Sequence, residues 1–175
     1  MLYRKLAIAG AALIEIAVPA RAEVVKSDAG GFVSSQRLIV DAPPEKLWDT
    51  IARPQLWWSK DHTYSGDAAN LSLDPRAGGC WCENLPGGSV EHARVIHADR
   101  GKLLRLSGAF GPLQSGAVSA TLSFELKRRG QGSEVTVTYV VGGYHPAGLA
   151  AFARPVDGVF AALMAALKRV AEAGK

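Results

Sequence analysis

Two cysteines, a glutamate and a histidine lie close together in the stretch GGCWCENLPGGSVEH, residues 78–92. Thiolates and imidazoles are the usual ligands of zinc, and a carboxylate beside an imidazole can support proton transfer. Structural zinc sites take four ligands, and their cysteines are typically spaced C-x₂₋₄-C. Cys80 and Cys82 are separated by one residue, and the chain has no second Cys/His pair. We therefore expect neither a metal nor another cofactor.

The Pro-Gly-Gly run at 86–88 predicts a hairpin turn between two strands. A three-residue loop at 86–88 would place Cys82 opposite His92, whereas a two-residue loop at 87–88 would place Glu83 opposite His92. Both registers stay open. The expected outcome is a cross-strand pair of Glu83 and His92, or a pair of small buried cysteines.

The first residues have the pattern of a secretory signal. Residues 4–5 are basic, residues 6–18 form an apolar run interrupted by Glu15, and Pro19 precedes small residues up to Ala22. This pattern predicts cleavage after Ala22 and a periplasmic or secreted protein. The apolar run is shorter than the roughly 20 residues of a bilayer span, so no stable span is expected after cleavage. An uncleaved tail or a membrane-associated helix is the alternative.

An exported protein with two cysteines often contains a disulfide. On a regular strand, however, the Cα atoms of Cys80 and Cys82 would lie near the upper limit for a bridge. We therefore expect these two cysteines to remain unpaired.

The charge of the chain gives no support for nucleic-acid binding. The full chain carries a net charge of +4, and loss of the signal would remove three basic residues and one acidic one, leaving +2. A nucleic-acid site needs a basic face. The basic cluster Lys127–Arg129 lies beside Gly130 and Gly132, which predicts the solvated tip of a hairpin.

The remaining chain predicts one α+β domain. The expected divisions are a signal peptide at 1–22, a flexible segment at 23–31 and the domain at 32–173. Hydrophobic alternation and turn residues predict strands at 32–42, 70–74, 78–84, 89–99, 102–108, 118–126 and 134–141. Two short helical segments are expected within 43–59, and apolar residues at helical spacing predict a long C-terminal helix that Pro155 should kink or start. Helices at the ends of a run of strands are typical of α+β folds.

This order resembles the helix-grip fold of the SRPBCC superfamily, which includes START, birch-pollen-allergen and polyketide-cyclase proteins. The segments that carry the resemblance are VDAPPEKLWDTIARPQLWWS, DPRAGGCWCE, ARVIHADRGKLLRL and the long C-terminal helix, and together it spans nearly all of residues 32–172. The chain is most similar to the branch named for the heat-shock-protein-90 ATPase activator. The resemblance implies a curved antiparallel sheet of six to seven strands around the terminal helix.

The resemblance also implies an apolar cavity between sheet and helix that binds a small hydrophobic or amphipathic molecule or a lipid, and mostly apolar pockets are where such ligands sit. The candidate binding residues are Trp48, Trp57, Trp58, Trp81, His92, Phe110, Tyr139, Phe152, Phe160 and Met164. Trp57 and Trp58 would point about 100° apart on a helical turn, so one of them is expected at the cavity mouth.

Two other functions remain open, as does the oligomeric state. A cyclase- or dehydratase-like enzyme would use acid and base residues in the cavity, with Glu83, His92, Arg94 and Tyr139 as candidates. A protein-binding, co-chaperone-like module is the third hypothesis. We expect a binding protein more than an enzyme, and we assign no catalytic residue.

Overall fold

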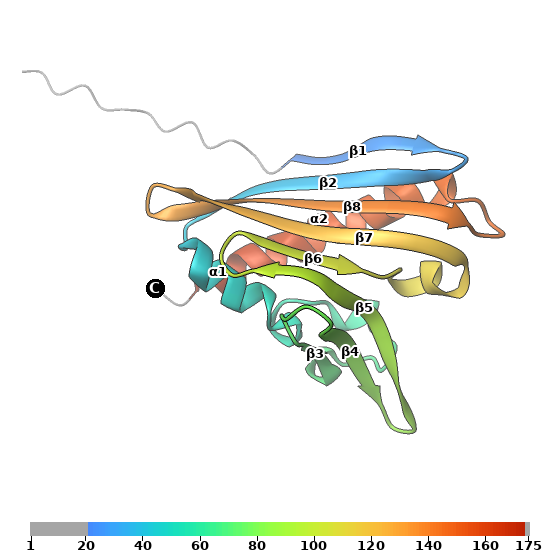
Figure 1. Cartoon of the computed structure of the whole chain (residues 1–175), viewed down its shortest axis with the longest axis horizontal. Helices are drawn as coiled ribbons and strands as arrows, with labels where there is room; N and C mark the ends of the chain where they lie inside the picture. Colours follow the sequence, from blue (N-terminus) through green and yellow to red (C-terminus); the bar gives the residue numbers. More distant parts are fainter. Residues whose placement is uncertain (1–20, 174–175) are drawn as a thin grey trace, which may run out of the picture.

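The computed structural model describes residues 21–173, which form one eight-stranded antiparallel sheet and several helices. The strands are β1 (Arg21–Asp28), β2 (Gly31–Val40), β3 (Leu71–Leu73), β4 (Cys80–Leu85), β5 (Gly88–Asp99), β6 (Leu103–Ser107), β7 (Ala117–Arg129) and β8 (Gly132–Tyr144). Their spatial order is β1-β2-β8-β7-β6-β5-β4-β3. Figure 1 shows this order, with the β4–β5 hairpin extending away from the rest of the sheet.

The two short helical segments within 43–59 and the long C-terminal helix occupy the positions that the sequence predicts, whereas three further 3-10 turns were not predicted. Helix α1 (Pro44–Ile51) begins at a proline, which suits the first turn of a helix, and carries Glu45 near its positive end. Short 3-10 turns follow at η1 (Pro54–Leu56), η2 (Lys60–His62) and η3 (Ala68–Asn70), and η4 (Gly111–Ser115) links β6 to β7. Helix α2 (Ala150–Glu172) lies along one face of the sheet (Figure 1). The α+β helix-grip class is therefore confirmed.

Most of the segment at 23–31, for which flexibility is the expectation, belongs to the edge strand β1. This strand pairs with β2, for example at Val24 with Ser34 and at Asp28 with Gly31. Its polar composition gives no clear alternation, and the backbone hydrogen bonds to β2 order it instead. The predicted signal peptide lies outside the described residues except for its last two positions, which form the start of β1.

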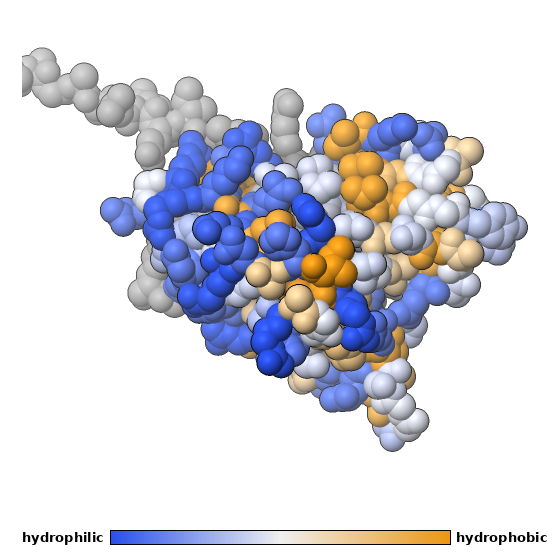
Figure 2. Space-filling view, in the orientation of Figure 1, coloured by the Kyte–Doolittle hydropathy of each residue, from blue (hydrophilic) through white to orange (hydrophobic). Residues whose placement is uncertain are grey.

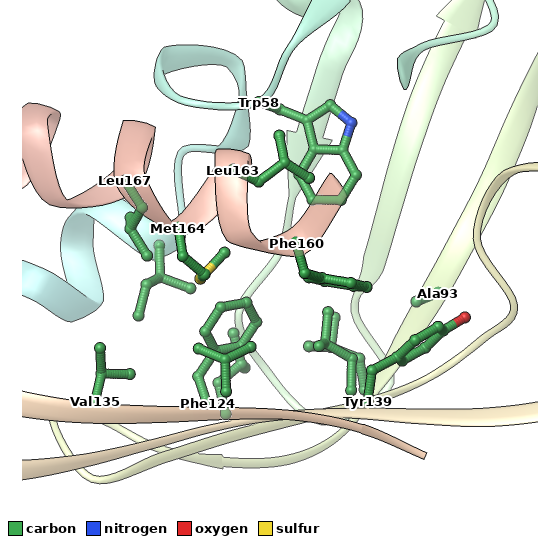
Figure 3. Close-up of a cluster of buried hydrophobic side chains, with 14 of the residues drawn as sticks. Trp58, Ala93, Phe124, Val135, Tyr139, Phe160, Leu163, Met164 and Leu167 are labelled. Carbon is green, nitrogen blue, oxygen red and sulfur yellow. The ribbon is translucent and has the colours of Figure 1, made fainter. Parts of the chain in front are cut away.

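Helix α2 closes the concave side of the sheet. Figure 3 shows Phe160, Met164 and Leu167 of α2 pointing toward Phe124, Val135 and Tyr139 of the sheet, whereas Leu163 of the same helix points away from these three. All seven side chains are buried, and burial of each large apolar side chain contributes about 1.5–3 kcal/mol. The helix begins at Ala150, so Pro155 does not start it. Its length and composition also fit a membrane span, as those of core helices often do.

Polar contacts fix the position of α2 against β2. Asp157 Oδ1 accepts hydrogen bonds from Ser34 Oγ at 2.6 Å and from Gln36 Nε2 at 2.8 Å. Ser34 and Gln36 are 1% and 4% exposed, so both depend on Asp157 to satisfy their polar atoms. Near the other end of the helix, Lys168 donates to the carbonyl oxygen of Ile39.

The surface differs between the two ends of the sheet. Figure 2 shows hydrophilic residues gathered over the end of the sheet at which a turn joins β7 to β8, and hydrophobic residues toward the opposite end. The basic residues Lys127–Arg129 finish β7 and are exposed, as predicted for a hairpin end. Exposed hydrophobic side chains elsewhere include Val25, Val140 and Tyr144.

Candidate ligand cavity

A cavity of about 540 Å³ lies between α2, the sheet and the loops that follow α1 and β6. Most of its surface is apolar. Its lining consists of Trp58, Asp61, His62, Thr63, Tyr64, His92, Phe110, Gly111, Pro112, Leu113, Tyr139, Phe152, Pro155, Val156, Val159, Phe160 and Leu163. This volume falls within the range of sites for small molecules, which is roughly 300–1,000 Å³.

The structure brings six of the ten predicted binding residues to the cavity wall, namely Trp58, His92, Phe110, Tyr139, Phe152 and Phe160. The other four, Trp48, Trp57, Trp81 and Met164, are buried in the hydrophobic core and do not line the cavity. Whether the six residues contact a ligand remains a prediction.

The two adjacent tryptophans have different roles in the packing. Trp58 lines the cavity and donates its indole N–H to the carbonyl oxygen of His62 at 2.9 Å. Trp57 packs behind it and donates to the carbonyl oxygen of Thr50 at 3.0 Å. Their ring centroids lie 5.5 Å apart in an edge-to-face arrangement. Both are at least nine-tenths buried, because Trp81 fills the remaining space beside them.

His92 faces the cavity because β5 contains one extra residue at this point. The loop of the hairpin is formed by residues 86–87, since Leu85 pairs with Gly88. Along the hairpin, Cys82 then pairs with Glu91 and Trp81 with Ala93, so His92 has no opposite residue. Neither register considered from the sequence is therefore correct. The irregularity is a β-bulge, which turns both His92 and Ala93 toward the interior.

Glu83 is hydrogen-bonded to the imidazole of His92. Its side chain is fully buried, and Oε2 lies 2.9 Å from His92 Nε2. Backbone N–H groups of Tyr64 and Ser65 donate to the same carboxylate at 3.1 and 2.5 Å. Desolvation alone would raise the pKa of Glu83, but the hydrogen bonds from Ser65, Tyr64 and His92 outweigh it and lower that pKa. Glu83 and His92 are therefore hydrogen-bonded, with Glu83 as a carboxylate, but they are not the directly opposed cross-strand pair that was expected.

The protonation of His92 follows from these contacts. Burial lowers its pKa, and the neighbouring Glu83 offsets this only in part, so the imidazole is neutral near pH 7. A carboxylate only accepts hydrogen bonds, so the single imidazole proton lies on Nε2. Nδ1 is then an unprotonated acceptor. The ring is stacked on Phe110, with centroids 6.0 Å apart and planes 9° apart, and Tyr64 lies on it at 5.8 Å.

Tyr139 lines the cavity with its ring rather than with a free hydroxyl. The hydroxyl oxygen accepts from the backbone N–H of Phe110 at 3.0 Å and donates to the carbonyl oxygen of Gly108 at 3.4 Å. Burial raises its pKa to about 12. Arg94, another acid/base candidate, lies outside the cavity, where it bonds to Glu91 and to the carbonyl oxygen of Gly78. Of the four candidates, His92 alone lines the cavity with a side-chain atom, Nδ1, that has no hydrogen-bond partner among residues 21–173.

The loop residues at the mouth of the cavity were not predicted from the sequence. Asp61, His62 and Thr63 belong to or follow the η2 turn, and Tyr64 comes next. The Tyr64 hydroxyl donates to the carbonyl oxygen of Gly111 at 3.0 Å, which joins this loop to η4. Small polar residues in the loop after the two tryptophans were the available signal for a cavity rim.

The prediction of unpaired cysteines is wrong, because Cys80 and Cys82 form a disulfide. Their Cα atoms are 5.4 Å apart, closer than the roughly 6.6 Å of two residues in a regular strand. This contraction occurs where β4 faces the bulge of β5. Among residues 21–173, no group of three or more His, Cys, Asp or Glu side chains is arranged to hold a metal ion.

A curved antiparallel sheet that encloses an apolar cavity with a long C-terminal helix defines a helix-grip protein of the SRPBCC type. Residues 32–172 match the sequence profile described as polyketide cyclase / dehydrase and lipid transport. The chain belongs to this family. The comparison with curated proteins gave no match.

Solved structures with the same fold come from several bacteria. A protein from Rhodobacter sphaeroides is 16% identical with a TM-score of 0.59, and the alignment covers 89% of this chain and 100% of that one. A conserved protein of unknown function from Enterococcus faecalis is 12% identical with a TM-score of 0.60, covering 87% and 77%. The Aha1 dimer from Colwellia psychrerythraea is 19% identical with a TM-score of 0.55, covering 81% and 96%. At these identities the likeness concerns the fold alone.

Proposed function

We propose that the protein binds a small, largely apolar molecule in the cavity between the sheet and α2. The observation that carries the proposal is the apolar cavity of about 540 Å³ itself. Aromatic side chains surround much of it, including Trp58, Phe110 and Phe160. A ligand there would lose most of its contact with water. This removal of apolar surface from water is the main source of affinity for apolar molecules.

A pair of tryptophan substitutions on α2 tests this proposal. Val159 lines the cavity, whereas Ala162 is exposed on the same helix. Val159→Trp should fill the cavity and abolish binding of an apolar fluorescent probe such as Nile red, while Ala162→Trp should bind it as wild type does. Circular dichroism checks that both variants are folded. Equal probe binding by both variants, or none by wild type, would rule out the cavity as the site.

We also propose that the protein acts outside the cytoplasm. The signal-like N-terminus supports export, and so does the Cys80–Cys82 disulfide, because disulfides persist mainly in oxidising compartments. Cleavage after Ala22 would leave Glu23 as the first residue, with the rest of β1 still able to pair with β2. Cell fractionation of a C-terminally tagged protein, followed by N-terminal sequencing, tests this. An intact Met1 in the cytoplasmic fraction would contradict it.

A second candidate function is proton-transfer catalysis on the bound molecule. The buried Glu83–His92 pair favours it, because Nδ1 can accept a proton while Glu83 stabilises the resulting imidazolium. An aryl β-diketone in D₂O provides a test, since a general base removes a methylene proton and returns deuterium from solvent. NMR should then show exchange that is faster with wild type than with His92→Phe. Equal rates would leave binding as the function.

A further inference from the structure

We infer that the cavity selects an uncharged, planar ligand that donates a hydrogen bond from a hydroxyl group to Nδ1 of His92. A phenol on an aromatic body fits this description. The inference rests on the proposed binding function and specifies the chemistry of its ligand.

Few hydrogen-bonding side-chain atoms in the cavity wall remain available to a ligand. The indole N–H of Trp58 is used by His62, and the hydroxyl of Tyr139 is used by Phe110 and Gly108. Among residues 21–173, Nδ1 of His92 has no hydrogen-bond partner, although the imidazole lines the cavity. Among these three side chains, the wall therefore offers an acceptor without a matching donor.

The protein fixes the tautomer of the His92 imidazole. Both Glu83 oxygens are held by N–H donors, from Tyr64 on Oε2 and from Ser65 on Oε1. These N–H donors favour the ionised carboxylate over the carboxylic acid, so Glu83 accepts from Nε2 of His92. The lowered pKa values of both groups agree with this arrangement. A ligand that offers only an acceptor would face a lone pair and leave it unsatisfied.

The charged groups around the cavity disfavour an anionic ligand. In the described part of the chain, no lysine or arginine lines the cavity, and the ionisable residues at the mouth are Asp61 and His62. A carboxylate ligand would therefore enter past Asp61 and approach the buried carboxylate of Glu83, with no fixed cation to offset its loss of hydration. Burial of an unpaired charge is costly, so an anionic ligand is disfavoured.

The shape of the aromatic wall around Nδ1 of His92 favours a flat ligand. The lone pair of Nδ1 lies in the plane of the imidazole. The ring planes of Phe110 and Tyr64 are inclined to this plane by 9° and 32°. A hydroxyl on a flat ring can approach in this plane while the ring packs among the aromatic walls. A hydroxyl on a bulky aliphatic ring matches the same wall less closely.

Three naphthalene probes that differ at one position test the inference by calorimetry near neutral pH. Naphthalen-2-ol donates a hydrogen bond, 2-methoxynaphthalene only accepts one, and 2-naphthoate carries a negative charge. Wild type should bind the naphthol about tenfold more tightly than the methoxy compound, and the naphthoate weakest of all. Equal affinities for naphthol and methoxy compound, or tightest binding of naphthoate, would overturn the inference while leaving the binding function intact.

Two variants separate a ligand contact from a structural role. His92→Phe should bind naphthol and methoxy compound equally. Glu83→Gln can keep an amide oxygen opposite Nε2, where it accepts from both Tyr64 and His92, so the imidazole proton stays on Nε2 and the preference for naphthol should persist. A purely structural role of His92 would leave the preference unchanged in both variants. If Glu83→Gln fails to fold, retention of the tenfold preference in His92→Phe still overturns the inference. If no probe binds wild type, the proposed function fails as well.

Discussion

Nε2 of His92 donates a hydrogen bond to Oε2 of Glu83 across 2.9 Å, although Glu83 and His92 are not paired across the hairpin. The bulge in β5 turns the imidazole inward, and Tyr64 and Ser65 hold the carboxylate that receives it. The pair is almost completely buried, with exposed fractions of 0% and 4%. Its properties therefore depend on the fold and should appear in the stability of the protein as well as in binding.

Acidification should destabilise the protein through His92. Burial lowers the pKa of His92 below its ordinary value of 6.5. Below pH 6.5 the imidazole in the unfolded chain therefore binds a proton more readily than the imidazole in the folded protein does. Stability should be complete above about pH 6.5 and decrease as the pH falls toward the lowered pKa. Glu83 adds a further loss at lower pH, because its pKa is also lowered. The other groups that face this imidazole or the cavity are Tyr64 at its ring and Asp61 and His62 at the mouth.

Urea unfolding of wild type and His92→Gln at about pH 7.5 and about pH 5.5 checks this. Wild type should lose more stability than the variant, which lacks the titrating imidazole. A wild-type free energy of unfolding that is unchanged, or an equal loss in the variant, would contradict the assignment.

Loss of the disulfide should weaken the hairpin only moderately. The link closes a very short loop, so the double variant Cys80→Ser/Cys82→Ser should lose about 1.5 kcal/mol of stability. Both cysteines are partly exposed, so iodoacetamide should label the native protein only after reduction. Two adducts without reductant, detected by mass spectrometry, would show that the bond does not form.

The contact between Asp157 and β2 should be worth more than a surface contact. Asp157→Ala leaves the buried side chains of Ser34 and Gln36 without their acceptor, at a cost of about 2–3 kcal/mol in the free energy of unfolding. Asp157→Asn keeps an acceptor oxygen in the same place and should cost clearly less. Chemical denaturation of the two variants measures the difference. Equal losses would mean that the acceptor oxygen is not what anchors α2.

Two buried tryptophans differ in whether their indole N–H is satisfied. Trp57 donates to Thr50, whereas the N–H of Trp81 is the one buried side-chain polar atom between residues 21 and 173 without a partner. Trp57→Phe and Trp81→Phe remove the same volume from the core, but only the first breaks a hydrogen bond. Thermal or urea unfolding should show Trp57→Phe to be less stable by about 1 kcal/mol. A larger loss for Trp81→Phe would contradict this.

Periodicity predicted the fold well where one face of an element is dry. Alternation from Val118 to Leu126 and from Val135 to Val141 anticipated β7 and β8, and helical spacing from Val156 to Val170 anticipated α2. Periodicity did not predict the edge strand β1, because neither face of this strand is fully buried. Its order comes from backbone pairing, which side-chain patterns do not report.

The site was harder to predict because it depends on departures from regular geometry. The aromatic residues were candidates by type, yet separating Trp58 from Trp57 required knowledge of how the turn after α1 packs. The disulfide and the inward side chain of His92 both depend on the irregular pairing between β4 and β5. A Pro-Gly-Gly turn shows that a hairpin exists but does not show where its ladder gains a residue.

The extra residue in β5 makes the orientation of His92 a matter of chain length as well as residue identity. Removing one residue between Gly88 and His92 would restore regular alternation, and the imidazole would then point to the opposite face of the hairpin. Two homologues could thus share the same histidine and glutamate in an alignment and still differ in whether their cavities contain a hydrogen-bond acceptor. The spacing from the turn to the histidine, more than the histidine itself, is the feature by which relatives with the same ligand chemistry should be recognised.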